Sequence, residues 1–359
     1  MILALALAAG CVLEESPKWG PDGTVPVRVE TVASGLDVPW SLAFLPGGDV
    51  LVSERPGRVR LLHDGKLEPK AVLRVETGES SEGGLLGIAV HPKDPSLLYL
   101  YLTAPGPQNQ LQRWKLAPDH RSAALDKVLI QGINAGNFHD GGRIRFGPDG
   151  MLYVGIGDAR EPMRAQEPKN LNGKILRVTP DGAPAPGNPI PGNPLFVLGV
   201  RNPEAFDWLD DGTLVIVDHG PSSELNRSGH DELTLAHKGD NLGWPTIYGC
   251  ETHEGLVTPQ ISWVTAVPPG GAAVYRGSTI PQWKDSVLIA SLGSRHLQRV
   301  QLEGGHVTLH EVYFRNALGR LREIVMTPQG ELWMTTSNCD GRGTCGGEHD
   351  RILRVVPAH

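Results

Sequence analysis

The chain has 359 residues, with 33 Lys or Arg against 40 Asp or Glu, which gives a formal net charge of −7. This acidic balance argues against a nucleic-acid-binding protein, which needs a basic face to displace counterions from phosphates. Glycine (45) and proline (30) lie well above their usual combined share of roughly 12 %, so we expect short strands and tight turns rather than long helices.

The first residues form the apolar run MILALALAAGC, which ends in small residues directly before Cys11. This pattern is typical of an export signal and resembles the end of a bacterial lipoprotein signal, although the usual basic start is missing. We therefore expect residues 1–25 to be a signal and linker, and the protein to be exported to the periplasm or the cell surface. A lipid anchor on Cys11 is one alternative, and an ordinary secretion signal is the other.

One phrase recurs along the rest of the chain: alternating apolar residues, a turn that contains glycine or proline, and a second β-rich run. Its copies begin at Leu42, Ile144, Phe206 and Ile324, with degenerate copies at Ile88 and near Val274. Period-2 alternation around a glycine turn predicts β-hairpins. The copies lie about 45 to 70 residues apart, which is the spacing of four-stranded propeller blades joined by loops of variable length.

Six copies predict an all-β fold, a single six-bladed β-propeller of four-stranded antiparallel blades over residues 26–359. The strand-like segment from Val27 to Val32 precedes the first copy. We expect it to pair with the segment from Ile352 to Val356, so that the last blade is completed and the ring has no exposed edge.

The cysteines suggest one short disulfide. Cys339 and Cys345 bracket the loop CDGRGTC, and two cysteines so close in an exported protein are expected to be linked. Metal binding is the alternative, but no second pair supplies further thiolates. Cys250 is left over, and we expect it to be a free buried thiol, with pairing to Cys339 or Cys345 as the alternative.

Polar residues just outside the predicted strands are candidates for a site, because inter-strand loops gather around the axis of a propeller. His139 and Asp140 come directly before a strand, and Asp158 ends the partner strand, where it could orient the imidazole. Arg201 and Asn202, in LGVRNPEAF, form a second polar cluster.

Two further clusters suggest a cation and an anion. Gly220 and Pro221 turn the chain sharply before Glu232, and freed carbonyls near carboxylates are hard ligands that suit calcium. A solvated acidic loop is the alternative there. Arg320 and Arg322 alternate in GRLRE and therefore share one face of a strand, where a ligand with several carboxylates would satisfy both.

From about residue 35 to residue 356 the chain resembles a known family, the soluble dehydrogenases of sugars that depend on pyrroloquinoline quinone (PQQ), or glucose/sorbosone dehydrogenases, and especially their aldose sugar dehydrogenase branch. The motifs that carry the resemblance, in the family's order, are GLDVPWSLAFLP, ERPGRVRLL, EGGLLGIAVHP, HDGGRIRFGPDG, LNGKILRVTPDG, LGVRNPEAFDW, HGPSSELNRSGHDEL, NLGWP and GRLREI. The resemblance implies a six-bladed propeller with the quinone over its central channel.

The resemblance also implies roles for the first two polar clusters. His139 would be the general base that takes the proton from the C1 hydroxyl of the sugar while hydride moves to C5 of the quinone. Asp158 would orient that histidine. Arg201 and Asn202 fall on positions that contact the reactive quinone oxygens, where a cation stabilises the charge that develops on reduction.

By the same resemblance, the carbonyls of Gly220 and Pro221 would bind the catalytic calcium ion, which also holds the cofactor. Arg320 and Arg322 would clamp the carboxylates of the quinone. Further positions carried over from the family are Glu82 near the substrate, Trp263 as a wall of the pocket, and Glu232 with the backbone near Leu242 as a second, structural calcium site.

The sequence departs from the family at three places. Gly293 stands where well-studied members carry a lysine that contacts the cofactor, and Ser294 or Arg295 would have to substitute for it. Phe138 precedes the base where glucose-oxidising relatives carry a polar group, so the resemblance does not transfer a sugar preference. The family's NYGWP is NLGWP here, which leaves a carbonyl but no tyrosine side chain.

The leading hypothesis is a PQQ- and calcium-dependent enzyme that oxidises C1 of aldoses to lactones and passes two electrons to an external acceptor such as a quinone, a dye or a cytochrome. One alternative is a calcium-dependent propeller lactonase or other hydrolase, which needs no quinone. The pair Arg320 and Arg322 argues against it, because a lactonase has no tricarboxylate to hold. A non-catalytic propeller that binds a glycan or a protein is the other alternative.

Overall fold

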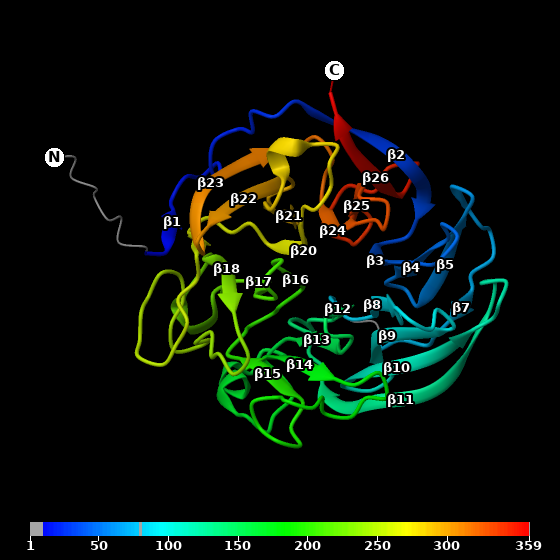
Figure 1. Cartoon of the computed structure of the whole chain (residues 1–359), viewed down its shortest axis with the longest axis horizontal. Coiled ribbons are helices and arrows are strands. Elements are labelled where there is room, and N and C mark those ends of the chain that lie inside the picture. The colour runs from blue at the N-terminus through cyan, green and yellow to red at the C-terminus, as the bar shows by residue number, and fades with distance from the viewer. Residues whose placement is uncertain (1–9, 79–80, 359) are drawn as a thin grey trace.

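The computed structural model describes residues 10–78 and 81–358 of the chain. Six sheets stand in a ring around a central axis (Figure 1), which confirms the predicted six-bladed β-propeller. The four strands that each blade has in common pair antiparallel, and two of the six sheets carry a fifth strand, which in one of them is parallel to its neighbour. The helices in the described residues are short 3-10 turns, namely η1 (Pro162–Gln166), η2 (Glu224–Asn226) and η3 (Pro281–Trp283).

In each blade the strands run from the axis outward. The first blade consists of β3 (Pro39–Phe44), β4 (Val50–Glu54), β5 (Arg58–His63), β6 (Lys66–Leu67) and β7 (Leu73–Arg74). The second consists of β8 (Leu85–Val90), β9 (Leu97–Ala104), β10 (Gln108–Leu116) and β11 (Ala123–Asn134). The third consists of β12 (Ile144–Phe146), β13 (Leu152–Ile156), β14 (Lys174–Val178) and β15 (Leu195–Leu198).

The remaining three blades repeat this plan. The fourth consists of β16 (Ala205–Trp208), β17 (Leu214–Asp218), β18 (Asp231–Ala236) and β19 (Ile261–Trp263). The fifth consists of β20 (Pro269–Val274), β21 (Val287–Ser291), β22 (Leu297–Glu303) and β23 (His306–Tyr313). The sixth consists of β24 (Leu321–Met326), β25 (Leu332–Thr336), β26 (Asp350–Pro357) and β2 (Val27–Leu36).

The repeated phrase of the sequence forms the two innermost strands of each blade. The turn between them contains a left-handed glycine in four blades, which explains why glycine recurs there. These glycines are Gly47, Gly150, Gly212 and Gly330, with φ values of 88°, 75°, 86° and 81°. The inner strands are almost wholly buried, because each lies between two neighbouring blades.

The ring closes as the sequence predicts. β2 pairs antiparallel with β26, and the register places Val27 opposite Pro357 and Val29 opposite Val355. The outer strand of the sixth blade therefore comes from near the start of the chain, and its other three strands come from the end. This pairing joins the two ends of the chain in one blade and so closes the ring.

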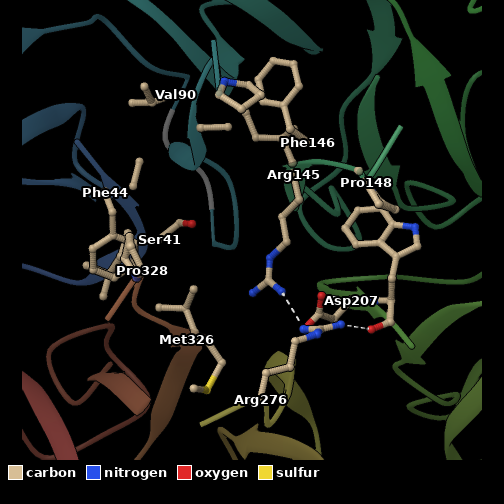
Figure 2. Close-up of a pocket in the computed structure, with 18 of the residues that line it drawn as sticks. Ser41, Phe44, Val90, Arg145, Phe146, Pro148, Asp207, Arg276, Met326 and Pro328 are labelled. Carbon is tan, nitrogen blue, oxygen red and sulfur yellow. Dashed lines mark hydrogen bonds and ion pairs between the residues drawn. The ribbon is translucent and has the colours of Figure 1, made fainter. Parts of the chain in front are cut away.

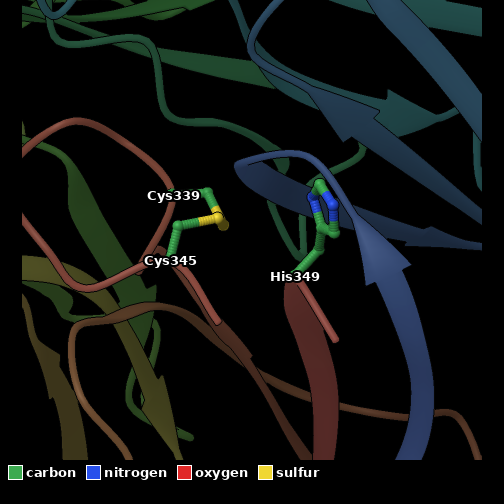
Figure 3. Close-up of side chains that lie close together, drawn as sticks. All are labelled: Cys339, Cys345 and His349. Carbon is green, nitrogen blue, oxygen red and sulfur yellow. A yellow bond between two sulfur atoms is a disulfide. The ribbon is translucent and has the colours of Figure 1, made fainter. Parts of the chain in front are cut away.

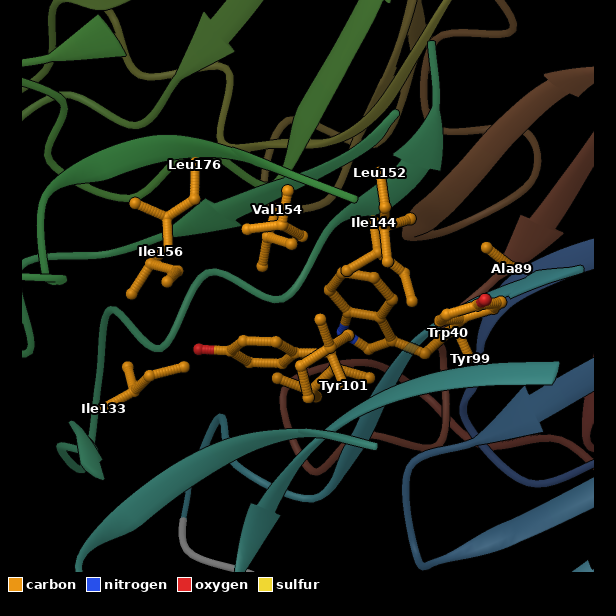
Figure 4. Packing of buried hydrophobic residues seen from close by; sticks show 13 residues of the cluster. Trp40, Ala89, Tyr99, Tyr101, Ile133, Ile144, Leu152, Val154, Ile156 and Leu176 are labelled. Carbon is orange, nitrogen blue, oxygen red and sulfur yellow. The ribbon is translucent and has the colours of Figure 1, made fainter. Parts of the chain in front are cut away.

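Apolar side chains from facing sheets fill the space between blades. Figure 4 shows this packing between the second and third blades, where Tyr99 and Tyr101 of β9 meet Ile144 of β12 and Leu176 of β14. The hydroxyl of Tyr101 donates a hydrogen bond of 3.0 Å to the main-chain carbonyl of Asp140. The core therefore holds the loop that leads into β12.

The disulfides agree only in part with the sequence predictions. Cys339 and Cys345 are linked as predicted. The prediction that Cys250 is a free thiol was wrong, because it is bonded to Cys11, which lies 239 residues away. In this structure the sulfur of Cys11 is therefore engaged in a disulfide.

Residues 10–25, which we expected to form a linker, lie along the outside of the propeller. β1 (Val12–Glu14) pairs parallel with β19 as a fifth strand of the fourth blade, and Trp19 donates its indole N–H to the carbonyl of Ala266 at 3.1 Å. Residues 1–9, which hold most of the predicted export signal, lie outside the described residues. In the part of the chain that the structure describes, no helix has the length and apolar character to cross a bilayer.

The Cys11–Cys250 disulfide closes a very long loop, so removing it should raise the entropy of the unfolded chain. We expect Cys11→Ser with Cys250→Ser to lower the free energy of unfolding by about 2–4 kcal/mol. Cys339→Ser with Cys345→Ser should cost less, because that loop spans only 6 residues. Thermal unfolding under non-reducing conditions measures both changes, and an unchanged midpoint for the first pair would contradict the linkage.

Candidate active site

The predicted polar residues gather at the end of the ring where the innermost strands begin. His139 precedes β12, Asn202 precedes β16, and Arg320 precedes β24. Each is buried, with an exposed fraction of 6 % or less. The propeller geometry therefore brings together residues that lie up to 181 positions apart in the sequence.

His139 and Asp158 form a buried pair. Nδ1 of His139 lies 2.7 Å from Oδ1 of Asp158, and the indole N–H of Trp244 donates to Oδ2 of the same carboxylate at 2.8 Å. Because an ionised carboxylate can only accept hydrogen bonds, it holds the proton of the neutral imidazole on Nδ1. Nε2 of His139 is therefore left as a proton acceptor.

The backbone around His139 explains the glycines of this region. His139 has a left-handed φ of 66°. A side chain on Gly157 would stand 2.1 Å from the carbonyl oxygen of His139, so only glycine fits in this position. On the other side, the carboxylate of Glu82 accepts the main-chain N–H of His139 at 3.0 Å.

Arg201 is connected to His139 through the carboxylate of Glu224, a residue that the sequence motifs did not single out. Its Nη2 lies 2.8 Å from Oε1 of Glu224, and that oxygen lies 3.5 Å from Nε2 of His139. Burial raises the pKa of Glu224, but Arg201 and nearby N–H groups outweigh burial, so the pKa lies below its ordinary value. Glu224 belongs to the motif HGPSSELNRSGHDEL and follows Ser223, whose φ is 82°.

Asn202 belongs to a second polar chain across the mouth of the ring. Its side-chain N–H donates to Oε1 of Glu204 at 3.1 Å, and the other oxygen of Glu204 pairs with Arg322. The main-chain N–H groups of Arg201 and Asn202 both donate to Asp218 at 2.7 Å. Glu204 and Asp218 thus set the positions of the predicted residues.

The arginine pair does not need a ligand to be stable. Nε and Nη2 of Arg320 each lie 2.8 Å from Oδ2 of Asp340, and Arg322 pairs with Glu204. Carboxylates of the protein itself therefore already satisfy the two guanidiniums, for which the sequence suggested a ligand with several carboxylates. Burial and the charge of Arg322 outweigh Asp340, so the pKa of Arg320 lies below its ordinary value.

The predicted calcium ligands line one small pocket. Gly220, Pro221, Glu232 and Leu242 all border it, together with Asp218. Burial, and secondarily the charge of Asp218, raises the pKa of Glu232 well above its ordinary value. Arg201 and His219 also line the pocket, but among the described residues no lysine, arginine or histidine forms an ion pair with Asp218 or Glu232. A hard cation would offset these two buried carboxylates.

Trp263, which the resemblance implies as a wall of the pocket, lies in the core of the structure. It is fully buried in β19, and it packs against Ala205, Val217 and Val267 in the core between the fourth and fifth blades. The apolar run ISW around it is a strand pattern, and a residue that faces the core of a blade cannot also face the mouth of the ring.

At the position of the missing lysine, the structure places Gly293 between Leu292 and the two candidate substitutes, Ser294 and Arg295. Gly293 is exposed, and a side chain there would meet Pro268 at 3.1 Å. Ser294 is buried and donates its hydroxyl hydrogen to the carbonyl of Val267 at 3.1 Å, so the hydroxyl is already engaged. Arg295 is exposed, and its backbone is left-handed, with a φ of 54°.

A larger cavity, of about 860 Å³, lies at the opposite end of the ring (Figure 2). Its walls come from the far ends of the innermost strands, including Phe44, Phe146 and Met326. Arg143 fills the axis between the two ends: its guanidinium donates to Ser41 and to the carbonyl of Gly270 at 2.9 Å and pairs with Glu323. None of the predicted site residues borders this cavity.

Comparison with known proteins assigns the chain to a family. Residues 36–353 match the family model for glucose/sorbosone dehydrogenase. The PQQ-bound form of an aldose sugar dehydrogenase from Streptomyces coelicolor has a TM-score of 0.84 and 37 % sequence identity, over 94 % of this chain and 99 % of that one.

Two curated relatives extend this similarity. Aldose sugar dehydrogenase YliI of Escherichia coli K12 is 26 % identical over 95 % of this chain and 95 % of its own length. Quinoprotein glucose dehydrogenase B of Acinetobacter calcoaceticus is 23 % identical over 87 % of this chain and 85 % of its own length. The fold and the polar site thus define an oxidoreductase of the propeller class. The chain belongs to the glucose/sorbosone dehydrogenase family.

Asp140, next to His139, makes the free energy of unfolding depend on pH. Burial raises the pKa of Asp140 to about 6, although Asn109 donates a hydrogen bond to it at 2.8 Å. An unfolded aspartate ionises near pH 4. Between about pH 4 and pH 6 the unfolded chain therefore loses this proton before the folded chain does, and stability falls as the pH rises.

We expect Asp140→Asn to remove the destabilisation that the ionised, buried Asp140 carboxylate causes above about pH 6. At about pH 7.5 the variant should be more stable than the parent chain by on the order of 1–3 kcal/mol, and at about pH 4.5 the difference should shrink. Chemical unfolding of both proteins at the two pH values measures the effect. A difference of equal size at both would show that the ionisation of Asp140 is not its cause.

Proposed function

We propose that the protein is a PQQ- and calcium-dependent dehydrogenase that oxidises the C1 hydroxyl of aldose sugars to lactones. The observation that carries this proposal is the His139–Asp158 pair, which leaves Nε2 of His139 as the proton acceptor, 3.5 Å from the Glu224 carboxylate that also pairs with Arg201. The electrons would pass on to an external acceptor such as a quinone or a cytochrome. The S. coelicolor structure is described as PQQ-bound, which supports the choice of cofactor.

The donor groups at the mouth of the ring suit a polyanionic cofactor. Arg201 and Arg160 both approach the carboxylate of Glu224, so their positive charges already converge on an anionic group. Among the described residues, the buried Nε atoms of Arg201 and Arg322 have no hydrogen-bond partner. These unpaired donors are of the kind that carboxylate and quinone oxygens satisfy.

When bound, PQQ supplies the two-electron acceptor that takes the hydride from C1 of the sugar. Arg201 and Asn202 would contact its reactive oxygens, and Arg320 and Arg322 would hold its carboxylates. A guanidinium close to these oxygens stabilises negative charge that develops during reduction.

The protein's own part in the chemistry is to remove a proton. Nε2 of His139 accepts the proton of the C1 hydroxyl, while Asp158 keeps Nδ1 protonated and the ring oriented. The imidazolium that forms is stabilised by Asp158 at 2.7 Å and by Glu224 at 3.5 Å. Both carboxylates are nearly inaccessible to water, which strengthens this stabilisation.

The resemblance implies two calcium sites, but Gly220, Pro221, Glu232 and Leu242 line one small pocket beside Asp218. We therefore propose one ion there, with oxygen ligands from the carbonyls of Gly220 and Pro221, the carboxylate of Glu232 and the backbone of Leu242, as hard cations prefer. The carbonyl of Pro221 already accepts one hydrogen bond, from the N–H of Gly229 at 2.9 Å, and its second lone pair is available for the ion.

We further propose that the protein acts outside the cytoplasm. All four cysteines are in disulfides, which form and persist in oxidising compartments such as the periplasm. The apolar run before Cys11 supports export as well.

The class of activity is tested by reconstitution of the purified chain with PQQ and calcium, followed by a dye-linked assay across a panel of aldoses. We expect sugar-dependent dye reduction and the spectrum of the reduced quinone on addition of sugar. Hydrolysis of lactones without quinone, in place of this result, would support the lactonase alternative.

His139→Ala should abolish turnover and leave PQQ binding largely intact, because the variant loses the proton acceptor but keeps the arginines. A titration of PQQ into the purified variant, beside the dye-linked assay, separates the two effects. Equal loss of binding and turnover would mean that His139 has a structural role.

Arg320→Lys with Arg322→Lys should weaken PQQ binding by tenfold or more, because lysine keeps the charge but loses the two-point contact to a carboxylate (roughly 1–3 kcal/mol). The thermal unfolding midpoint of the same variant shows whether the fold survives. Unchanged PQQ affinity in a folded variant would remove the clamp assignment.

A further inference from the structure

A disulfide-closed loop of the sixth blade reaches the site, and the proposed function does not use it. Cys339 and Cys345 close this loop between β25 and β26 (Figure 3). It carries two charged residues, Asp340 and Arg342, whose side chains point to different parts of the site. We call residues 339–345 the disulfide loop.

Arg342 is linked to His139 through one carboxylate. Its Nη1 lies 3.0 Å from Oε1 of Glu82, and the second oxygen of Glu82 accepts the main-chain N–H of His139 at 3.0 Å. Its Nη2 donates to the hydroxyl of Ser81 at 3.0 Å. The guanidinium also stands 5.5 Å from the centre of the Phe138 ring, a cation–π contact.

These contacts hold Glu82 in one orientation. Burial raises the pKa of Glu82, but the N–H of His139 and the guanidinium of Arg342 outweigh burial and bring the pKa below its ordinary value. Glu82 therefore stays ionised beside the proposed base. A carboxylate so placed is an acceptor for sugar hydroxyl groups.

Asp340 connects the same loop to the arginine pair. It accepts Nε and Nη2 of Arg320 at 2.8 Å, the hydroxyl of Ser337 at 3.1 Å, and the main-chain N–H of Arg342 at 2.9 Å. The disulfide loop thus orients Arg320, on the cofactor side of the site, and Glu82, on the substrate side.

The disulfide matters because the Arg342 contact is weak without it. The side chains of Arg342 and Glu82 are 46 % and 22 % exposed, and an isolated ion pair this close to solvent is weakened by screening and by the entropy of holding both side chains. Gly341 and Gly343 add backbone freedom to the loop. Closing the loop covalently restricts that freedom, so less entropy is lost when Arg342 is held in place.

The loop is not a metal site. Among the described residues, Cys339, Cys345 and His349 are the one group of cysteine, histidine and acidic side chains spaced closely enough to bind an ion. Both sulfur atoms are in the disulfide (Figure 3), so neither offers a thiolate.

We propose that Arg342, held by the Cys339–Cys345 disulfide, is a substrate-positioning residue that fixes the Glu82 carboxylate against His139 at the rim of the site. This inference rests on the proposed sugar oxidation. It assigns to Arg342 an effect on sugar binding, and to the disulfide the task of keeping Arg342 in place. Asp340, in the same loop, acts instead on the arginine pair.

The central test compares Arg342→Met with Arg28→Met in the reconstituted enzyme. Arg28 is a matched control, since it is 51 % exposed and forms a 2.7 Å ion pair with Glu30 far from the site. We expect Arg342→Met to raise the KM for sugar by about tenfold, with little change in kcat or in PQQ affinity. Arg342→Lys should recover part of the loss, and Arg28→Met should match the parent enzyme.

A second measurement needs neither cofactor nor sugar. Hydrogen exchange of the His139 amide in the purified chain should become faster in Arg342→Met, because Glu82 is then a looser acceptor. Cys339→Ser with Cys345→Ser should change both the exchange rate and KM in the same direction. Such an exchange result would stand even if the parent enzyme oxidised no sugar, so failure of the proposed function is distinguishable from failure of this inference.

The inference is overturned if Arg342→Met leaves the KM and the His139 amide exchange at the parent values. It is also overturned if the variant loses PQQ affinity as strongly as sugar affinity, because Arg342 would then act on the cofactor. If Arg342→Met has the expected effects but the double serine variant does not, the disulfide has no part in positioning.

Discussion

The hydrogen bond between Nδ1 of His139 and Asp158 is the contact on which the proposed chemistry depends. It is 2.7 Å long and almost closed to solvent, and Trp244 fixes the far oxygen of the carboxylate. Without it the imidazole could turn or carry its proton on Nε2, and no proton acceptor would face the mouth of the ring. His139 has a left-handed backbone, and its carbonyl oxygen lies so close to Gly157 that a side chain at position 157 would clash with it.

The ring architecture makes that contact part of a larger network. Glu82, His139, Arg201 and Arg320 come from loops that lead into the innermost strands of four different blades. Because all innermost strands begin at the same end of the axis, residues far apart in the sequence share one surface. Arg143 closes the axis behind them, so the site is a shallow polar mouth and not an open channel.

Much of this arrangement could be predicted from the sequence. The glycine turns and period-2 alternation indicated six blades, and the strand pattern of Val27 to Val32 indicated how the ring closes. The short spacing of Cys339 and Cys345 was enough to predict their disulfide. His139, Asp158, Arg201 and Asn202 could be found because each lies beside a strand end within a recognisable motif.

The rest depended on contacts that local patterns do not encode. Glu224, Glu204 and Asp340 are the carboxylate partners of the predicted arginines, but only tertiary structure shows which acidic residue faces which cation. The Cys11–Cys250 disulfide was missed because it depends on the parallel pairing of β1 with β19, across most of the sequence. The burial of Trp263 in the core likewise follows from tertiary packing, which the motif around it does not encode.

The most direct test of the account is the protonation state of His139 in the reconstituted enzyme, measured by 15N NMR of histidine-labelled protein near neutral pH. The account predicts a proton on Nδ1, in a strong hydrogen bond to Asp158, and an unprotonated Nε2 that gains a proton when sugar reduces the cofactor. A proton that resides on Nε2 in the resting enzyme would contradict it, because His139 could not then act as the base.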